Sequence, residues 1–182
     1  MQKLSFFTAA IIMGWLSMAA DSAVQIDPGP STLKANVHAT GHNFEAVAKN
    51  LKCDIRIDSE TGFPTKATVS FNVLDLGTEN DKRDKEMFHW LDSEHYPEIS
   101  YTFDSWKSDD HKVARGHLSI HGVNLPIETP IEIDRRGERL LIDGSFEIDT
   151  TRFNLEVIKK MLFLKVDPLL KISFHIEGKV QS

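Results

Sequence analysis

The stretch Lys171-Ile172-Ser173-Phe174-His175-Ile176-Glu177 is the clearest indication of the fold class, because apolar and polar side chains alternate along it without a break. Successive side chains of a β-strand point to opposite faces, so this pattern is typical of a strand with one dry face and one wet face. We therefore predict a half-buried strand here.

The same period of two recurs along most of the chain. Alternating runs cover residues 33–39, 53–58, 69–73, 99–104, 117–121, 131–134, 145–149 and 171–177. Turn-forming residues separate several of these runs, at 61–64, 108–110, 136–137 and 167–168. Eight or nine short strands at this spacing predict an antiparallel sandwich or barrel. A parallel sheet is not expected, because its strands read as continuous apolar runs and need crossover helices between them.

One segment departs from the strand pattern. Between Asn80 and Asp92, Met87 and Leu91 are four residues apart and Phe88 and Leu91 are three apart, so the three side chains share one helical face. Thr78 or Asn80 can cap such a helix. We predict one short helix, held against the sheet or laid across one end of a barrel.

Composition limits the function. Hydrophobic residues make up 41% of the 182 residues and charged residues 26%, with a formal net charge of -6. A nucleic-acid surface needs a dense basic stripe, so no nucleic-acid partner is expected. The polar faces of the strands carry Asp, Glu, Lys, Ser and Thr, whereas a membrane barrel turns apolar residues outward. The sequence therefore predicts a soluble barrel with its apolar face inward.

The N-terminus predicts export. Lys3 precedes an apolar run from Leu4 to Ala20, and small residues follow, which is the order of a secretory signal peptide. We assign residues 1–22 to the signal peptide and 23–182 to one barrel domain, with cleavage after Ala19 or after Ser22. The alternative is an uncleaved anchor; after cleavage no membrane span is expected. Cys53 is the single cysteine, so no internal disulfide forms, and we expect it to be a small buried apolar residue.

The histidines do not form a recognisable metal or catalytic motif. On a strand, the Cα atoms of His117 and His121 would lie roughly 13 Å apart, too far to share a zinc ion. His38 and His42 have the same spacing, but Gly41 between them can bend the chain and bring them closer. The chain lacks a Gly-x-Ser-x-Gly motif and a phosphate loop. We therefore expect no metal site and no catalytic residues.

Three stretches resemble the YceI family of exported lipocalin-like proteins. The first runs from Arg83-Asp84 through Tyr96-Pro97-Glu98-Ile99 to Phe103, and the second is Gly116 to Ile127, with Gly-x-Leu-x-Ile followed by Gly-Val and a proline. The third and least specific is Ile148 to Leu155, which contains an arginine and an aromatic residue. The sequence differs from the family pattern in two places. It has Pro30-Ser31 where the family has His-Ser, and Asn154-Leu155 where the family has a glycine after the aromatic residue.

The resemblance implies an all-β fold: an eight-stranded antiparallel lipocalin-like barrel with one short helix. It also implies a long internal cavity that binds polyisoprenoids or other long-chain amphiphiles, and a periplasmic location. Strand periodicity alone does not separate such a cavity from a barrel filled by its own side chains. The run Met161-Leu162-Phe163-Leu164, apolar on both faces, is consistent with a lid or with a strand that the helix covers.

Our first hypothesis is a carrier or reservoir for a polyisoprenoid, an isoprenoid quinone, or a fatty amide or acid. A tail that exposes roughly 400 Å² would gain about 10 kcal/mol gross on burial, before the ordering costs of binding. A bound isoprenoid lipid or quinone is the only cofactor-like molecule we expect. We expect Arg83 and Asp84 to pair with each other and pin the helix. The predicted wall residues are Val69, Phe71, Val73, Phe103, Leu118, Ile120, Phe146, Ile148, Phe153, Leu164, Ile172 and Phe174.

Two other functions stay open at this point. A closed barrel without ligand could act as a stress-protective or protein-interaction module, and a homodimer is compatible with either function. An enzyme that uses His38 and His42 at a barrel mouth is the third hypothesis, although we predict that the protein is not an enzyme.

Overall fold

The computed structural model describes residues 21–160 and 164–181, without the side chains of residues 159, 160, 164 and 165. The long strands carry most of the chain, and one α-helix and two 3₁₀ turns connect them. The elements are β1 (Asp21–Ile26), β2 (Thr32–Ala39), β3 (His42–Ala48), β4 (Lys52–Asp58), β5 (Pro64–Asn72), η1 (Val73–Asp75), β6 (Leu76–Gly77), α1 (Asp81–Trp90), β7 (Glu98–Trp106), β8 (Val113–Ile120), β9 (Val123–Arg136), β10 (Arg139–Asp149), η2 (Thr150–Phe153), β11 (Lys159–Lys160), β12 (Leu164–Lys165) and β13 (Leu169–Val180).

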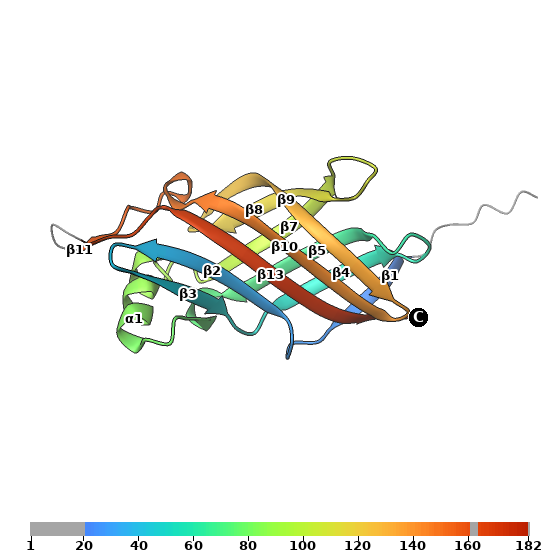
Figure 1. Cartoon of the computed structure of the whole chain (residues 1–182), viewed down its shortest axis with the longest axis horizontal. Coiled ribbons are helices and arrows are strands. Elements are labelled where there is room, and N and C mark those ends of the chain that lie inside the picture. Colours follow the sequence, from blue (N-terminus) through green and yellow to red (C-terminus); the bar gives the residue numbers. More distant parts are fainter. Residues whose placement is uncertain (1–20, 161–163, 182) are drawn as a thin grey trace, which may run out of the picture.

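Eight of these strands close into a ring. The pairing order β1-β4-β5-β7-β8-β9-β10-β13 returns to β1 through the β1–β13 pair, which joins Val24 to Val180. Every neighbouring pair in the ring is antiparallel. Figure 1 shows the elongated barrel, with α1 at one end and the C-terminus at the other. The predicted eight-stranded antiparallel barrel with one helix is confirmed.

Strand β13, which contains the alternating stretch 171–177, holds the ring together. One edge pairs with β10 from Leu169 to Lys179, and the other edge pairs with β2 and then with β1. The inward and outward faces follow the predicted alternation, since Ile172 and Ile176 are buried. A strand bonded on both edges leaves no exposed edge, which explains why this stretch reads so regularly.

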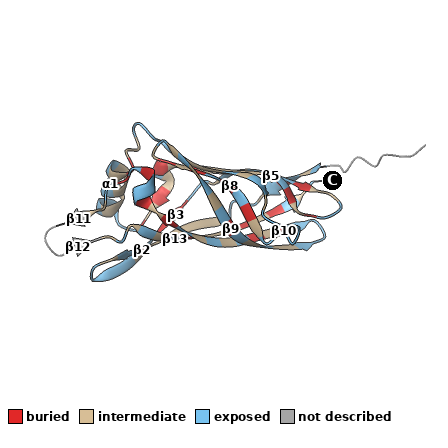
Figure 2. Ribbon diagram, turned by 90° about the horizontal axis from the view of Figure 1, so that it is seen from above, coloured by how far each residue is buried: buried red, intermediate tan, exposed pale blue. Residues whose placement is uncertain are grey.

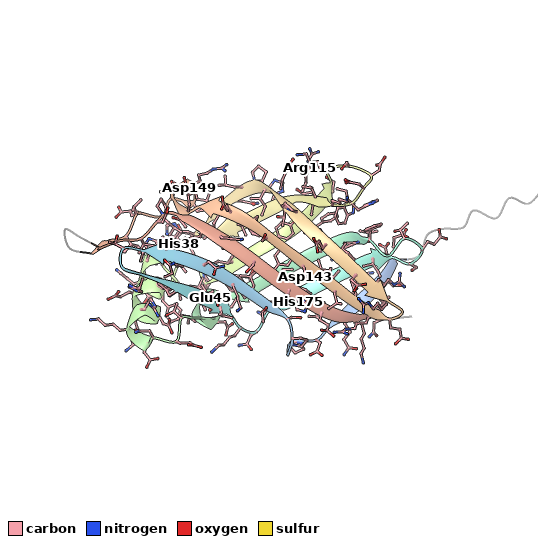
Figure 3. All side chains as sticks on the ribbon, viewed as in Figure 1. His38, Glu45, Arg115, Asp143, Asp149 and His175 are labelled. Atoms are coloured by element: carbon pink, nitrogen blue, oxygen red, sulfur yellow. The ribbon has the colours of Figure 1, made fainter. Side chains whose placement is uncertain are left out.

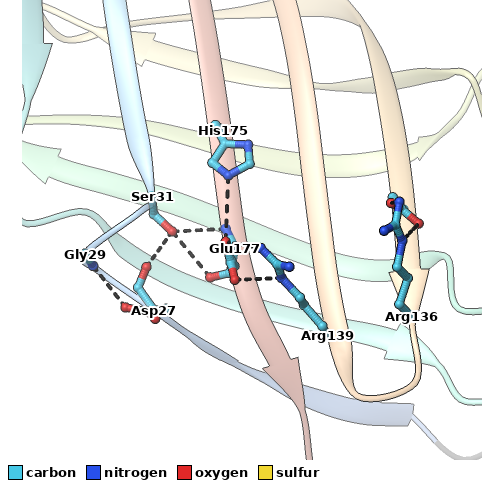
Figure 4. Close-up of polar contacts among 8 residues, drawn as sticks. Asp27, Gly29, Ser31, Arg136, Arg139, His175 and Glu177 are labelled. Carbon is cyan, nitrogen blue, oxygen red and sulfur yellow. Dashed lines mark hydrogen bonds and ion pairs between the residues drawn. The ribbon is translucent and has the colours of Figure 1, made fainter.

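The chain bends between β1 and β2, and a polar network fixes the bend to β13 (Figure 4). The hydroxyl of Ser31, a buried residue, donates to the carbonyl oxygen of Asp27 at 2.6 Å and accepts from the backbone N–H of Glu177 at 3.0 Å. The guanidinium of Arg139 donates to both carboxylate oxygens of Glu177, at 2.8 and 3.1 Å. Ser31, at one of the two departures from the family pattern, thus has a structural partner.

Helix α1 is attached by polar contacts as well as by apolar packing. Asn80 is the N-cap, and its side chain accepts from the backbone N–H of Arg83 at 3.0 Å. Arg83 and Asp84 both bond to Thr78: the guanidinium of Arg83 donates to its hydroxyl and carbonyl oxygens at 2.9 Å, and its N–H donates to Asp84 at 2.9 Å. The expected mutual pair is therefore corrected. Neighbouring helical residues do not face each other, so Thr78 acts as the shared partner.

Two tight turns explain sequence features of the chain. His121 and Gly122, with φ of 50° and 72°, form the two-residue connection between β8 and β9. Backbone twist at such a hairpin favours two residues of positive φ. Asn154 has φ of 58° at the C-cap of η2. Asparagine tolerates this left-handed conformation better than most residues, so it can replace the glycine that the family pattern has there.

Besides the two-residue strands β6, β11 and β12, the sequence patterns missed two longer strands, β1 and β3. In β3 only Phe44 is a bulky apolar residue on the inward face, and the next two inward residues, Ala46 and Ala48, are small, so the alternation is weak. β1 overlaps the small-residue region assigned to signal cleavage. Cleavage after Ala19 would leave β1 whole, whereas cleavage after Ser22 would remove its first two residues. Residues 1–20, which hold most of the predicted signal peptide, and the run 161–163 lie outside the described residues.

We predict that Thr78→Val lowers the free energy of unfolding by about 1–3 kcal/mol, because Arg83 and Asp84 would lose the buried hydroxyl that bonds to both of them. Thr78 is 4% exposed, so water cannot replace the hydroxyl. Urea unfolding followed by circular dichroism measures the change. Thr102→Val, at an exposed position on β7, is the matched control and should change stability little. Equal effects of the two substitutions would contradict the role of Thr78.

A second prediction concerns pH. The hydrogen bonds from Arg139 lower the pKa of Glu177 below its ordinary value of 4.5. A carboxylate with a lowered folded-state pKa stabilises the fold above its ordinary pKa, and this contribution is lost as the pH falls through the lowered value. Glu177→Gln should therefore lower the thermal midpoint at pH 7 and flatten its decline in acid. Glu132→Gln, an exposed carboxyl on β9, should behave as the wild type. Parallel profiles for wild type and Glu177→Gln would contradict this prediction.

Candidate functional site: an apolar cavity inside the barrel

The barrel encloses a cavity of about 1780 Å³. At the end near the C-terminus, a packed cluster closes the lumen: Ile57 and Leu140 are almost fully buried there, and Ile55, Ile142 and Ile176 of the same cluster form the cavity floor. Figure 2 shows buried residues on the strands near this end. The cavity therefore extends from this floor toward the α1 end.

Most of the predicted wall residues face this cavity. Val73 and Phe153 are 1% and 2% exposed, but they pack into the core cluster outside the cavity wall. Leu164 lies in β12, and its side chain is outside the described part of the chain. Whether any of them contacts a ligand stays a prediction. The predicted residues that line the cavity are Val69, Phe71, Phe103, Leu118, Ile120, Phe146, Ile148, Ile172 and Phe174.

Two glycines keep large aromatic rings against the wall. A Cβ added to Gly144 would lie 2.4 Å from Cζ of Phe174, which pairs with Gly144 across β10 and β13. A Cβ added to Gly116 would lie 2.5 Å from the phenol oxygen of Tyr101. Each ring thus occupies space that a side chain on the neighbouring strand would need. Because these rings lie across the strands, they take up less of the lumen.

Small residues and tryptophans complete the wall, and the sequence patterns did not single them out. Ala35, Ala46, Ala67 and Ala114 face the cavity, where larger residues would fill it. Trp90 and Trp106 also line it. An alternating run with alanine at inward positions is the signal that could have identified the alanines. For the tryptophans, which lie at the ends of α1 and β7, we find no such signal.

The α1 end of the cavity is polar. The guanidinium of Arg83 lies 4.1 Å from the ring centroid of Phe44, and the indole N–H of Trp90 donates to the carbonyl oxygen of Glu156 at 2.8 Å. These contacts connect α1 to β3 on one side and to the segment after η2 on the other. The charged residues that line the described cavity all belong to this end: Lys82, Arg83, Glu86, Asp92, Glu156 and Asp167.

The histidine pairs do not converge. Ala39 and His42 are direct partners in the β2–β3 hairpin, so they share a face, and His38 points to the opposite face. His42 lines the cavity, whereas His38 is exposed on β2 (Figure 3). Nδ1 of His117 lies 2.6 Å from the carboxylate of Asp104 on the barrel exterior, and His121 lies in the turn after β8. Among the described residues, no three His, Cys, Asp or Glu side chains are placed to hold a metal ion.

Cys53 is half-buried on β4, and burial raises the pKa of its thiol to about 11. A thiol with so high a pKa is almost fully protonated at neutral pH and is a poor nucleophile. Its side chain packs against the apolar cluster at the closed end. In the part of the chain that the structure describes, no helix has the length and apolar character required to span a membrane.

We predict that a long-chain apolar ligand that carries bromine quenches the fluorescence of both tryptophans in the cavity wall. Trp90 lies at the α1 end and Trp106 at the other end of β7, so a chain brominated near its tail should quench Trp106 more strongly if the tail enters first. Fluorescence titration of Trp90→Phe and Trp106→Phe separates the two signals. If neither tryptophan is quenched at saturating ligand, the chain does not occupy this cavity.

The geometry described above has clear relatives. Burkholderia cenocepacia BcnA matches with a TM-score of 0.74 and 18% identity over 84% of this chain and 99% of its own. A polyisoprenoid binding domain from Saccharophagus degradans matches with a TM-score of 0.67 and 15% sequence identity, over 90% of this chain and 100% of its own. The YceI protein of Campylobacter jejuni matches with a TM-score of 0.65 and 17% sequence identity, over 80% of this chain and 90% of its own. No curated protein sequence matches. Residues 24–178 match the YceI-like domain, and the chain therefore belongs to the YceI-like family.

Proposed function

We propose that this barrel binds a long-chain apolar or amphiphilic molecule in its lumen and acts as its carrier or reservoir. The cavity of about 1780 Å³ with an apolar wall is the observation that carries this proposal. Pockets for drug-sized molecules are usually about 300–1,000 Å³, so this volume suits a much longer chain. A polyisoprenoid, an isoprenoid quinone, or a fatty amide or acid has the required shape.

The wall chemistry supports a chain-like ligand. The deep part of the wall consists mainly of aliphatic and aromatic side chains, which offer dispersion contacts but no charge to hold a small polar substrate. Charged side chains gather at the α1 end, where a polar head group would meet water. One of the similar structures is named as a polyisoprenoid binding domain, which agrees with such a ligand.

The N-terminal sequence supports a proposed cellular location. We predict export through the N-terminal signal and a periplasmic protein that carries its ligand between membranes or stores it. Intact-mass measurement of the exported protein tests this step, because cleavage after Ala19 or after Ser22 leaves two distinct masses.

The two alternative functions have weaker support. A closed module without ligand requires a filled lumen, and the cavity volume argues against that. An enzyme built on His38 and His42 requires the two imidazoles to act together, and their positions on opposite faces of the hairpin argue against that.

Ala35→Phe tests the proposal, because it places a large ring inside the lumen beside Ala46 and Ile172. We expect it to weaken binding of a fluorescent polyene fatty acid at least tenfold, because the ring occupies space that the ligand needs. Displacement titration measures the affinity, and native mass spectrometry of the exported protein measures the bound ligand directly.

Asn36→Phe is the matched control, since the neighbouring side chain points to the outer face of the same strand. It should bind the probe as the wild type does. Circular dichroism should show both variants folded. If Ala35→Phe binds the probe with unchanged affinity, or if the wild type carries no ligand and binds no long-chain probe, the proposal fails.

A further inference from the structure

Two hydroxyl groups in the apolar part of the cavity wall have no hydrogen-bond partner in the described structure. They are the phenol oxygen of Tyr101 and Oγ1 of Thr129, and both oxygens are buried. Thr129 is only 3% exposed, and both residues line the cavity. Native proteins supply a partner for nearly every buried polar group, so two unpartnered hydroxyls in one wall require an explanation.

The two hydroxyls belong to the same region of the wall. Tyr101 lies near the middle of β7, and its ring crosses the neighbouring strand at Gly116, since a Cβ there would lie 2.5 Å from the phenol oxygen. Gly116 pairs with Ile127 of β9, and Thr129 is the next inward residue on that strand. The ring of Tyr101 therefore extends toward the strand that carries Thr129, about halfway along the barrel.

Both groups are suited to donate a hydrogen bond. Burial, together with the nearby charge of Asp104, raises the pKa of Tyr101 to about 12, so its phenol stays protonated. The described residues of β7, β8 and β9 that line the cavity include no charged side chain. An anionic ligand group would be buried there without a counter-charge, which is costly. An uncharged acceptor oxygen would satisfy the donors without that cost.

We propose that Tyr101 and Thr129 form a binding point for an uncharged carbonyl oxygen carried by the long-chain ligand. This inference rests on the proposed function, and it selects among ligands. Isoprenoid quinones and fatty amides have such an oxygen, whereas a plain hydrocarbon lacks it and a diphosphate carries charge. Because both oxygens are covered in the ligand-free barrel, ligand binding requires the Tyr101 ring to turn away from Gly116 and the Thr129 hydroxyl to turn with it toward the lumen.

A pair of ligands of equal chain length tests the assignment: oleamide labelled with ¹³C at its carbonyl, and 1-octadecene. Displacement titration gives both affinities for the wild type, Tyr101→Phe, Thr129→Val and the double variant. We expect oleamide binding to weaken about tenfold in the double variant, the size of one to two hydrogen bonds, and octadecene binding to stay unchanged. The labelled carbonyl stretch should move to higher frequency in the double variant, as it does when a hydrogen bond is lost.

Matched controls are available in the chain. Tyr96→Phe removes the other phenol group, which lies outside the cavity wall, and Thr102→Val removes an exposed hydroxyl on the outer face of β7. Neither should change the affinity for oleamide or its carbonyl frequency. Ligand-free Tyr101→Phe should be at least as stable as the wild type, because the removed hydroxyl bonds nothing there.

The outcomes separate the two proposals. If neither oleamide nor octadecene binds the wild type, the proposed function itself is wrong. If both bind and the double variant changes neither affinity nor carbonyl frequency, only the carbonyl site is wrong. A drop in the stability of ligand-free Tyr101→Phe, or a crystal structure of the oleamide complex in which both hydroxyls bond only to an ordered water, would also overturn the site.

Discussion

The hydrogen bonding of β13 along both of its edges is the constraint on which the structure depends. It joins β10 on one side to β1 and β2 on the other, and the short β1 pairing closes the ring. Once the ring is closed, the inward apolar side chains face the lumen instead of the outer surface, whether or not they touch a neighbour across it. The barrel can therefore keep an apolar lumen that its own side chains do not fill.

The open lumen results from the sizes of the inward residues. Four isoleucines, Leu140 and Val24 pack the end near the C-terminus, whereas alanines and the aromatic rings that lie against Gly116 and Gly144 line the cavity. A core at native packing density would need bulky residues at the alanine positions. The chain thus gives up packing energy along the cavity and retains it at the closed end. A long apolar ligand would restore the missing contacts, which is the physical basis of the proposed function.

The polar groups follow the same division between the two ends. Arg83 and Asp84 are held by Thr78 at the α1 end, where charged side chains line the cavity. In the middle of the described wall, the buried hydroxyls of Tyr101 and Thr129 lack hydrogen-bond partners. A ligand with an apolar chain and one uncharged oxygen would match this distribution, because each of its parts would meet a wall of its own polarity.

Local sequence patterns were enough to predict most of the long strands, the single helix and the all-β class, because a period of two and a helical spacing are local properties. The choice of Asn80 over Thr78 as the helix cap came from the structure. Nine of the twelve predicted wall residues face the cavity for the same reason, since alternation specifies which side chains point inward. Which of these residues border empty space follows from the three-dimensional packing alone. Val73 and Phe153 lie in the 3₁₀ turns and are buried against other side chains, and Arg83 bonds to Thr78 rather than to Asp84. The cavity depends on residue volumes summed across eight strands, and no local pattern contains that sum.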